Sequence, residues 1–242
     1  MRAAVVSDIH GNLTAFEAVL ADVRAQAPDL VLHGGDLAES GSSPAEIVDE
    51  VRALGWAGAL GNTDEMQTRP ESLDQFVATS KAPPVVWAAV REMAAATRAR
   101  LGDERIRWLA GLPDRLVFDE FTLLHASPGD PWRAPGPAAS DEELKNAFQS
   151  LGATTVVYGH THHAVVHRLA GWTVANSGSA GMPYDGDPRA AYLLIDQGQP
   201  RIRRVPYNVE REVQRLRESS LPQWQWMARM LRTVAPSLPE PA

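Results

Sequence analysis

Short apolar runs alternate with amphipathic stretches over the first sixty residues of the chain. Apolar runs at 3–6, 30–32 and 56–60 predict three strands, and apolar positions at helical spacing in 13–25 and 44–54 predict two helices between them. Alternating strands and helices favour a parallel sheet covered by helices. Ligands of such sheets bind beyond the carboxyl ends of the strands. The residues that follow these three strands are therefore the first candidates for a functional site.

The remainder of the chain changes from helical to strand-rich at Pro113. Before it, apolar positions at helical spacing predict helices at 75–79, 85–100 and 105–110, around a break at two consecutive prolines. Beyond it, the apolar runs predict seven strands, at 115–118, 121–125, 154–158, 164–169, 172–176, 191–195 and 202–205. The second half of the chain is therefore expected to extend the sheet structure.

Length and composition favour one globular domain. The chain has 242 residues, of which 44% are hydrophobic and 22% are charged, as is usual for globular proteins that bury a core. We expect a single domain over 1–242, with a helical insertion at about 65–111 and C-terminal helices at about 208–235. The packing face of those last helices carries Trp224, Trp226 and Met230, which also leave a homodimer interface open.

The formal net charge of -7 at pH 7 and the pI near 5.5 argue against a broad basic surface. Without such a surface, the counterion release that drives binding to long duplex nucleic acid is not available. A small anionic substrate remains compatible with this charge, because bound divalent cations dominate the field close to them.

The chain contains no cysteine, so disulfides, thiolate metal ligands and cysteine nucleophiles are excluded. Any metal must then be held by nitrogen and oxygen atoms. The apolar stretch before Ser7 is too short for a signal peptide, and no run of about 18 apolar residues predicts a membrane span. We expect a cytoplasmic protein that does not act at a membrane.

Polar residues follow each of the three N-terminal strands, in the clusters 7–12, 33–36 and 61–64. Taken singly, the Gly, Asn and Asp residues of such clusters are equally typical of turns and helix caps. Four of the seven histidines also lie beside predicted strand ends, at His10, His125, His160 and His162. A two-residue step in extended backbone returns side chains to one face, so Asp8 should point with His10, and His160 with His162. Together these groups predict a metal site built from nitrogen and oxygen ligands.

These residues form five blocks in order along the chain: Asp8-x-His10, Gly35-Asp36, Gly61-Asn62, His125 and Gly159-His160-x-His162. Their order and intervals resemble the signature blocks of the calcineurin-like metallophosphoesterase superfamily, and the small bacterial and archaeal predicted phosphodiesterases resemble the chain most. The match covers roughly residues 1–206. The resemblance implies an α/β (α+β) fold, a four-layer α-β-β-α sandwich of two mixed sheets, with a two-metal centre at one edge.

The resemblance also implies which residues hold the metals. Asp8, His10, Asp36 and His162 would hold one ion, and Asp36, Asn62, His125 and His160 the other, with Asp36 as the bridge. Two divalent cations about 3.5–4 Å apart share a water molecule and lower its pKa, so that it loses a proton and attacks phosphorus in line as hydroxide. The expected catalytic residues are Asp36, Asn62 and Asp64, of which Asp64 is not itself an expected metal ligand. Manganese is the expected metal, although iron, zinc, cobalt or nickel suits the same ligands.

One position departs from the family pattern. Many relatives carry histidine directly after the asparagine, where it is thought to protonate the leaving oxygen or grip the phosphate, whereas this chain has Thr63. General acid catalysis typically contributes about 100- to 10,000-fold, so esters with poor leaving groups should react slowly. His33 and His163 are neighbours of expected ligands but should turn to the opposite face. Substrate contacts are expected from three residues: Asn12, Thr63 and Arg133.

The leading functional prediction is a phosphodiesterase acting on a small nucleotide-like or organic phosphate ester. A phosphomonoesterase or a dinucleoside polyphosphate hydrolase is the alternative within the enzymes, because metals recognise the phosphoryl group rather than its substituents. A protein-binding scaffold is the alternative outside them, since the retromer scaffold subunit resembles this fold. Because all seven ligand positions are filled, the enzyme is favoured.

Overall fold

Two five-stranded sheets pack face to face in the computed structural model, which describes residues 1–240. The order of the first sheet is β10-β9-β1-β2-β3. β1, β2 and β3 run parallel to one another, and β9 and β10 are antiparallel to their neighbours. The bounds are β1 (Arg2–Val6), β2 (Leu30–His33), β3 (Ala57–Gly58), β9 (Ala190–Asp196) and β10 (Gln199–Val205).

The second sheet is also mixed, in the order β4-β5-β6-β8-β7. Its three central strands are parallel, and its two edge strands are antiparallel. The bounds are β4 (Arg115–Val117), β5 (Thr122–Leu124), β6 (Thr155–Tyr158), β7 (Ala164–Leu169) and β8 (Trp172–Ser177). All ten predicted strands are present, most with ends shifted by one to three residues.

Strand β1 shows how the sequence builds the layers. Ala3 and Val5 belong to the core between the two sheets, whereas Ala4 and Val6 belong to the core under the helices. Alternate residues of a strand point to opposite faces, so a strand covered on both sides needs an unbroken apolar run. The core between the sheets is completed by Leu32, Phe121, Leu123, Val157, Ala175, Leu193 and Ile195.

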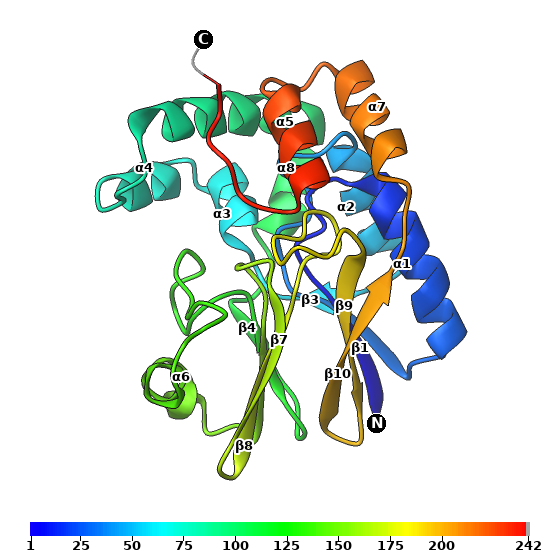
Figure 1. The fold of residues 1–242 in the computed structure, drawn as a ribbon, viewed down its shortest axis with the longest axis vertical. Coiled ribbons are helices and arrows are strands. Elements are labelled where there is room, and N and C mark those ends of the chain that lie inside the picture. Colours follow the sequence, from blue (N-terminus) through cyan, green and yellow to red (C-terminus); the bar gives the residue numbers. More distant parts are fainter. Residues whose placement is uncertain (241–242) are drawn as a thin grey trace.

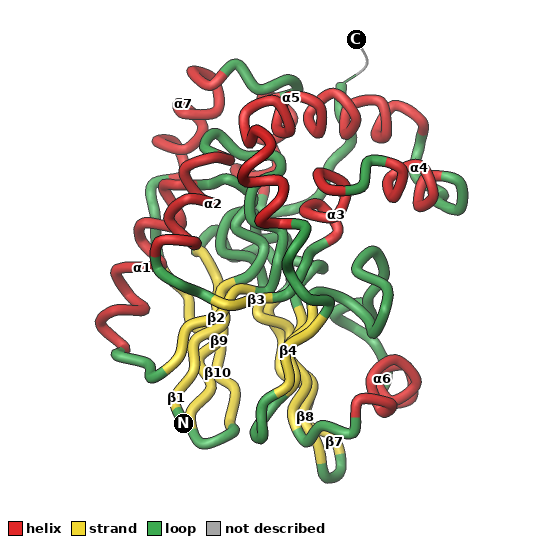
Figure 2. The backbone as a smooth tube through the Cα atoms, turned by 180° about the vertical axis from the view of Figure 1, so that it is seen from behind, coloured by secondary structure: helices red, strands yellow, loops and turns green. Residues whose placement is uncertain are grey.

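Helices cover the outer face of each sheet. α1 (Leu13–Gln26) and α2 (Pro44–Ala53) pack on the first sheet through side chains such as Phe16 and Ile47. α6 (Asp141–Phe148), followed by the short 3-10 helix η1 (Gln149–Leu151), covers the second sheet through Leu144 and Phe148. Figure 2 shows the four layers side by side, helix, sheet, sheet and helix, which confirms the expected α-β-β-α sandwich.

Two groups of helices cover the end of the sandwich at which the parallel strands end (Figure 1). The first group is α3 (Asn62–Thr68), α4 (Glu71–Val77) and α5 (Pro84–Leu109), and the second is α7 (Val209–Ser219) and α8 (Trp224–Thr233). α5 joins the two helices predicted at 85–100 and 105–110 through a kink at Gly102, whose φ of 67° is left-handed. Within residues 1–240, no helix is long and apolar enough to cross a membrane.

Candidate metal centre

Five of the seven expected metal ligands lie in tight turns just beyond strand ends, with left-handed backbone. Their φ angles are positive: 55° at Asp8, 50° at His10, 55° at Asp36, 66° at His160 and 59° at His162. The prediction that the Asp8/His10 and His160/His162 pairs align through extended backbone was therefore wrong, although the site does form. A non-glycine residue held in this region costs on the order of 1–3 kcal/mol, and such strain clusters at functional sites.

Hydrogen bonds between the turns hold this strained backbone. The Asp8 and His10 amides donate to the Gly35 and Asp36 carbonyl oxygens, each at 3.0 Å. The amide of Gly181 donates to the Asp8 carbonyl oxygen, also at 3.0 Å. The turn after β1 is thus fixed by the turn after β2 on one side and by the segment after β8 on the other.

Glycines in the ligand blocks allow the turns to approach one another closely. A Cβ atom on Gly61 would collide with the Asp36 carboxylate, and one on Gly159 would collide with the Asp8 carboxylate. At Gly35, where φ is 89°, a Cβ would meet the backbone of Gly61. The glycine beside each of these ligands is therefore required by packing around the carboxylates.

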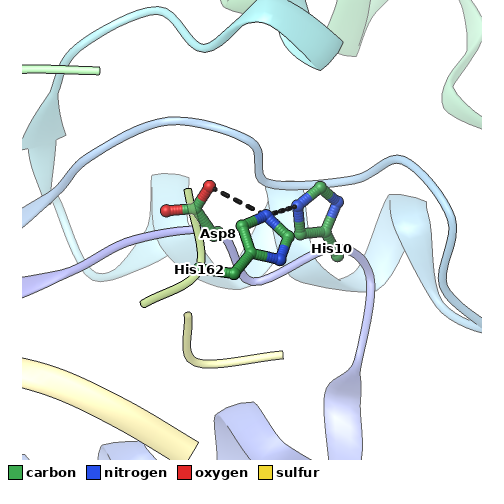
Figure 3. A group of neighbouring side chains, drawn as sticks. All are labelled: Asp8, His10 and His162. Carbon is green, nitrogen blue, oxygen red and sulfur yellow. Dashed lines mark hydrogen bonds and ion pairs between the residues drawn. The ribbon is translucent and has the colours of Figure 1, made fainter. Parts of the chain in front are cut away.

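Asp8, His10 and His162 form the first group of metal-ligating atoms (Figure 3). The Nε2 atoms of His10 and His162 are 3.0 Å apart, and the His162 Nε2 is 3.3 Å from the Asp8 Oδ1. All three side chains are buried. His162 lies between the other two, and the three side chains would together hold a single cation.

Asp8, Asp36 and His125 form the second group. The Asn62 Oδ1 is 3.0 Å from the His125 Nε2 and 2.9 Å from the His160 Nδ1, which brings the remaining two expected ligands to the same place. The resemblance assigned Asp8 to one metal, whereas the structure places it in both groups.

Asp36 lies between the two groups, as a bridging ligand must. Its Oδ2 is 3.7 Å from the His10 Nε2, and its Oδ1 is 3.6 Å from the His125 Nε2. One carboxylate oxygen therefore faces each group. The structure thus brings all seven expected ligands together at one edge of the two sheets.

The protonation of the histidines tests whether this cluster suits metal ions. His10, His125 and His162 each place Nδ1 against a backbone carbonyl oxygen, of Glu39, Gly34 and Met182 respectively, at 2.6–3.1 Å. A carbonyl only accepts, so each Nδ1 carries the proton and each Nε2 of the neutral ring keeps a lone pair. Two lone pairs then face each other at 3.0 Å between His10 and His162. A cation relieves that repulsion, so the donor set fits a metal.

Electrostatics agree with this assignment. Burial raises the pKa of Asp8, but its contact with His162, and the charge that His162 carries when protonated, lower the pKa by more, so the carboxylate stays ionised. Burial lowers the pKa of His160 to about 4, with His125 acting in the same direction. At His125 burial lowers the pKa, but the charges of Asp36 and Asp8 outweigh it and the net shift is upward. The pocket of negative charge beside His125 therefore attracts a proton or a metal ion.

Asp64 and Thr63 support Asp36 from α3. The Asp64 carboxylate accepts the amides of Asp36, Leu37 and Gly61 at 2.7–3.1 Å, and burial, followed by the charge of Asp36, raises its pKa to about 6. The Thr63 amide donates to the Asp36 Oδ1 at 2.9 Å. Asp64 thus positions the turn that carries Asp36 rather than facing the metals.

The other two expected substrate-contacting residues are engaged in contacts away from the ligand side chains. Asn12 is buried and caps α1: its Oδ1 accepts the Ala15 amide at 2.9 Å, and its Nδ2 donates to the Gly181 carbonyl oxygen at 2.7 Å. Arg133 is exposed and pairs with Asp130 at 3.1 Å. Neither residue is brought to the seven ligands by these contacts.

The two neighbouring histidines are also absent from the metal groups of the described residues. His33 is fully buried and packs on Trp108, with ring centroids 6.1 Å apart. His163 places its Nδ1 2.6 Å from the Thr161 carbonyl oxygen.

Sequence reasoning missed the supports of His162. The Tyr184 ring stacks on it, with centroids 4.5 Å apart and planes at 22°, and the Met182 carbonyl oxygen accepts its Nδ1–H. The Ser179 hydroxyl donates to the Asp8 carbonyl oxygen at 2.7 Å. No spacing rule links Tyr184 and Met182 to the ligands, because they reach the site from the loop after β8.

Solved structures of other proteins share the fold of this chain. A crystal structure of a metallophosphoesterase from Sphaerobacter thermophilus is 27% identical, with a TM-score of 0.78 and coverage of 97% of this chain and 100% of that one. A hypothetical protein from Pyrococcus horikoshii is 17% identical, with a TM-score of 0.83 and coverage of 98% and 99%, and shares the fold.

Sequence comparison agrees. An uncharacterized protein of Methanocaldococcus jannaschii is 28% identical over 246 residues, which cover 91% of this chain and 94% of the relative. The model of the calcineurin-like phosphoesterase superfamily domain matches residues 1–198, most of the chain. The chain therefore belongs to the calcineurin-like phosphoesterase superfamily and is a metallophosphoesterase, a hydrolase of phosphate esters.

Proposed function

We propose that this metallophosphoesterase is a phosphodiesterase for small nucleotide-like or other organic phosphate esters, working with two divalent cations. The observation that carries the proposal is the convergence of seven nitrogen and oxygen ligands in two groups, with one oxygen of Asp36 toward each. Two bound cations supply an acidified water and neutralise the phosphoryl oxygens as charge develops. No covalent enzyme intermediate is needed.

The residues of this chain hold the reacting groups in place. One cation would be held by Asp8, His10, Asp36 and His162, and the other cation by Asp36, Asn62, His125 and His160. The backbone carbonyls behind three of the histidines keep each Nε2 available, as partners of metal-bound histidines commonly do. Asp64 fixes the turn of Asp36 through three amide hydrogen bonds.

The ligand set does not select one metal by chemistry alone. We propose manganese, and iron, zinc, cobalt and nickel are the competing ions, because imidazole and carboxylate ligands accept all of them and availability decides. The test is hydrolysis by metal-free protein resupplied with each ion in turn. Highest activity with zinc or iron at matched occupancy would replace manganese in the proposal.

Diester preference is tested with metal-free protein resupplied with manganese. We expect bis-p-nitrophenyl phosphate to be hydrolysed with a higher kcat/KM than p-nitrophenyl phosphate. A preference for the monoester would make the protein a phosphomonoesterase. Failure to hydrolyse either ester with any of the five metals would contradict the proposal and favour a protein-binding scaffold.

A dinucleoside polyphosphate hydrolase is the second candidate. Thr63 supplies no acid, and phosphoanhydride leaving groups need less protonation than alcohols do. Release of mononucleotide from diadenosine tetraphosphate with a higher kcat/KM than diester cleavage would favour this candidate. A cytoplasmic location and a homodimer stay predictions from the sequence.

A further inference from the structure

A hollow opens beside the metal centre at His125. It has a volume of about 130 Å³, and its walls include Glu65, Ser127 and Asp130. A second hollow of about 240 Å³ lies against it, because Glu65, Gly129, Asp130 and Pro131 line both. Together they reach the lower end of the roughly 300–1,000 Å³ typical of small-molecule sites. Of the seven ligands, His125 lines the first hollow, so the two hollows extend from the His125 side of the metal centre.

The second hollow has an aromatic wall. The rings of Phe76 and Trp132 stack with centroids 4.9 Å apart and planes at 27°, and both are only partly buried. The Arg133 guanidinium lies 5.0 Å from the centre of the Phe76 ring, and Trp87 meets the same ring edge-on at 5.7 Å. Planar aromatic groups bind to such surfaces by stacking and cation–π contact.

Hydrogen bonds hold this wall in place before any ligand arrives. The Trp132 Nε1–H donates to Glu65, and the Trp132 amide donates to the Asp130 Oδ1 at 2.8 Å. Arg133 donates to the Thr79 hydroxyl at 2.6 Å and to Asp130 at 3.1 Å. A wall that is already ordered loses little conformational entropy when a ring stacks on it.

The wall is also tied to the metal ligands through the chain. Glu65 lies three residues after Asn62 on α3, and residues three apart share a helix face. Trp132 is in the loop that follows His125, which Ser127 and Asp130 close with two backbone hydrogen bonds of 3.0 Å. The distance from metals to wall is therefore fixed by two short segments of chain.

Charge in the second hollow favours a neutral ring over a second phosphate. Its two arginines are already paired, Arg69 with Glu65 at 2.6 Å and Arg133 with Asp130 at 3.1 Å. The two carboxylates also accept hydrogen bonds from hydroxyl or amino groups. A planar base with a hydroxylated sugar matches both properties of the lining.

We propose that the hollow lined by Phe76, Trp132 and Arg133 is a nucleoside subsite, in which the base stacks on the aromatic wall while the attached phosphate lies at the metal centre. This inference rests on the proposed function, since it places the phosphate at the metals. It assigns Arg133 to the base rather than to the phosphate. It also makes nucleotide esters the favoured class of substrate.

Binding of two phosphates that differ only in the base tests the subsite. We expect the manganese-loaded protein to bind adenosine 5′-monophosphate at least about tenfold more tightly than ribose 5-phosphate, because stacking on an aromatic side chain is worth roughly that factor or more. Trp132→Leu should remove this preference and leave ribose 5-phosphate binding within about twofold. Titration calorimetry measures both affinities.

Two further variants serve as a second test of the subsite and as a control. Arg133→Gln, at an exposed position, should also lower the affinity for adenosine 5′-monophosphate without altering the fold. Trp172→Leu is the matched control, because Trp172 lies on β8 and does not line the subsite. Equal binding of the two phosphates by the unmodified protein, or equal weakening of both by Trp132→Leu, would overturn the subsite.

Failure of the subsite and failure of the proposed function give different results. Hydrolysis of bis-p-nitrophenyl phosphate without any preference for adenosine 5′-monophosphate leaves the phosphodiesterase and removes the subsite. A clear preference for adenosine 5′-monophosphate without hydrolysis leaves the subsite and removes the phosphodiesterase.

Discussion

At the scale of single residues, Asp36 carries the greatest weight, because one of its carboxylate oxygens is directed at each half of the metal centre. Its backbone is held by Asp64, and its Oδ1 by the Thr63 amide. Charge, orientation and strained backbone therefore coincide at one side chain. Replacing it separates the contribution of its charge from that of its shape.

Asp36→Asn should abolish most of the activity while keeping the volume of the side chain. We expect kcat/KM for the diester to fall by at least about 100-fold, as loss of one positioned electrostatic group typically does. Metal content, measured by inductively coupled plasma mass spectrometry, should fall with it. Asp22→Asn is the control, since Asp22 pairs with Arg203 outside the metal groups. A variant that keeps both metal and activity would refute the bridging role.

His33 should make the stability of the protein sensitive to acid. Burial lowers its pKa to about 3, from an ordinary value near 6.5, and both ring nitrogens lack hydrogen-bond partners among the described residues. The unfolded chain therefore takes up a proton below pH 6.5 that the folded protein refuses. The stability contributed by neutral His33 is complete above pH 6.5 and is lost progressively as the pH falls towards 3.

Urea unfolding at pH 7 and pH 5, in chelator, measures this effect. The free energy of unfolding should fall by about 1 kcal/mol more per pH unit in the unmodified protein than in His33→Leu. The comparison removes the contributions of the carboxylates, because both proteins carry the same set. Identical pH dependence of the two proteins would show that folding does not lower the pKa of His33.

At the scale of elements, α8 is connected to the metal centre by Tyr184, which lies in the loop after β8. The Tyr184 hydroxyl contacts the sulfur of Met230 on α8 at 3.7 Å, and its ring stacks on His162. Met230 itself is buried among the side chains of α5, α7 and α8. The C-terminal helices therefore support the orientation of a metal ligand rather than only closing the core.

Tyr184→Leu should weaken metal binding. Loss of a partner that orients a ligand typically costs roughly 10- to 100-fold in metal affinity, so we expect at least about tenfold here, with kcat at saturating manganese little changed. Tyr184→Phe keeps the ring and should restore the affinity. Metal titration followed by activity distinguishes the two variants, and equal affinities in all three proteins would exclude the stacking role.

The strands and most helices could be predicted because their patterns are local. β1 reads as an unbroken apolar run, since both of its faces are covered. α6 was missed, although Ser140 and Glu143 form a capping box and Leu144 and Phe148 are one helical turn apart. Its eight residues carry too few apolar positions to establish a period, so the cap was the only local signal.

The candidate ligands could be chosen from the sequence, but their geometry could not. The positive φ of Asp8 and His160 depends on hydrogen bonds from distant segments, which no local pattern records. For the same reason the capping role of Asn12 and the amide contacts of Asp64 became visible only in the fold. The identity of a residue can be read from the sequence, whereas its backbone strain and its hydrogen bonds to distant segments depend on the tertiary structure.

At the scale of the whole molecule, the centre concentrates buried carboxylates and facing lone pairs, so the protein should be less stable without metal. An ion present at about 100 times its dissociation constant stabilises the folded state by about 2.7 kcal/mol. For a chain of this size, each kcal/mol shifts the Tm by roughly 2–4 °C. Chelation should therefore lower the Tm by about 5–10 °C.

Differential scanning calorimetry in chelator, and after addition of excess manganese, measures this shift. Manganese should restore the original Tm, whereas magnesium, which retains its waters and prefers oxygen ligands, should restore less. The Asp36→Asn variant should show little response to either ion. An unchanged Tm after complete metal removal would contradict the proposed ligand set.

The division of the ligands between the sheets has a consequence for how the protein can vary. Asp8, His10, Asp36 and Asn62 follow strands of the first sheet, and His125, His160 and His162 follow strands of the second. Between the sheets lie side chains such as Val5, Leu123 and Val157. A substitution there that changes the separation of the sheets also changes the separation of the ligands. Selection for catalysis therefore acts on this apolar layer as well, and the evolution of the core is bound to that of the reaction.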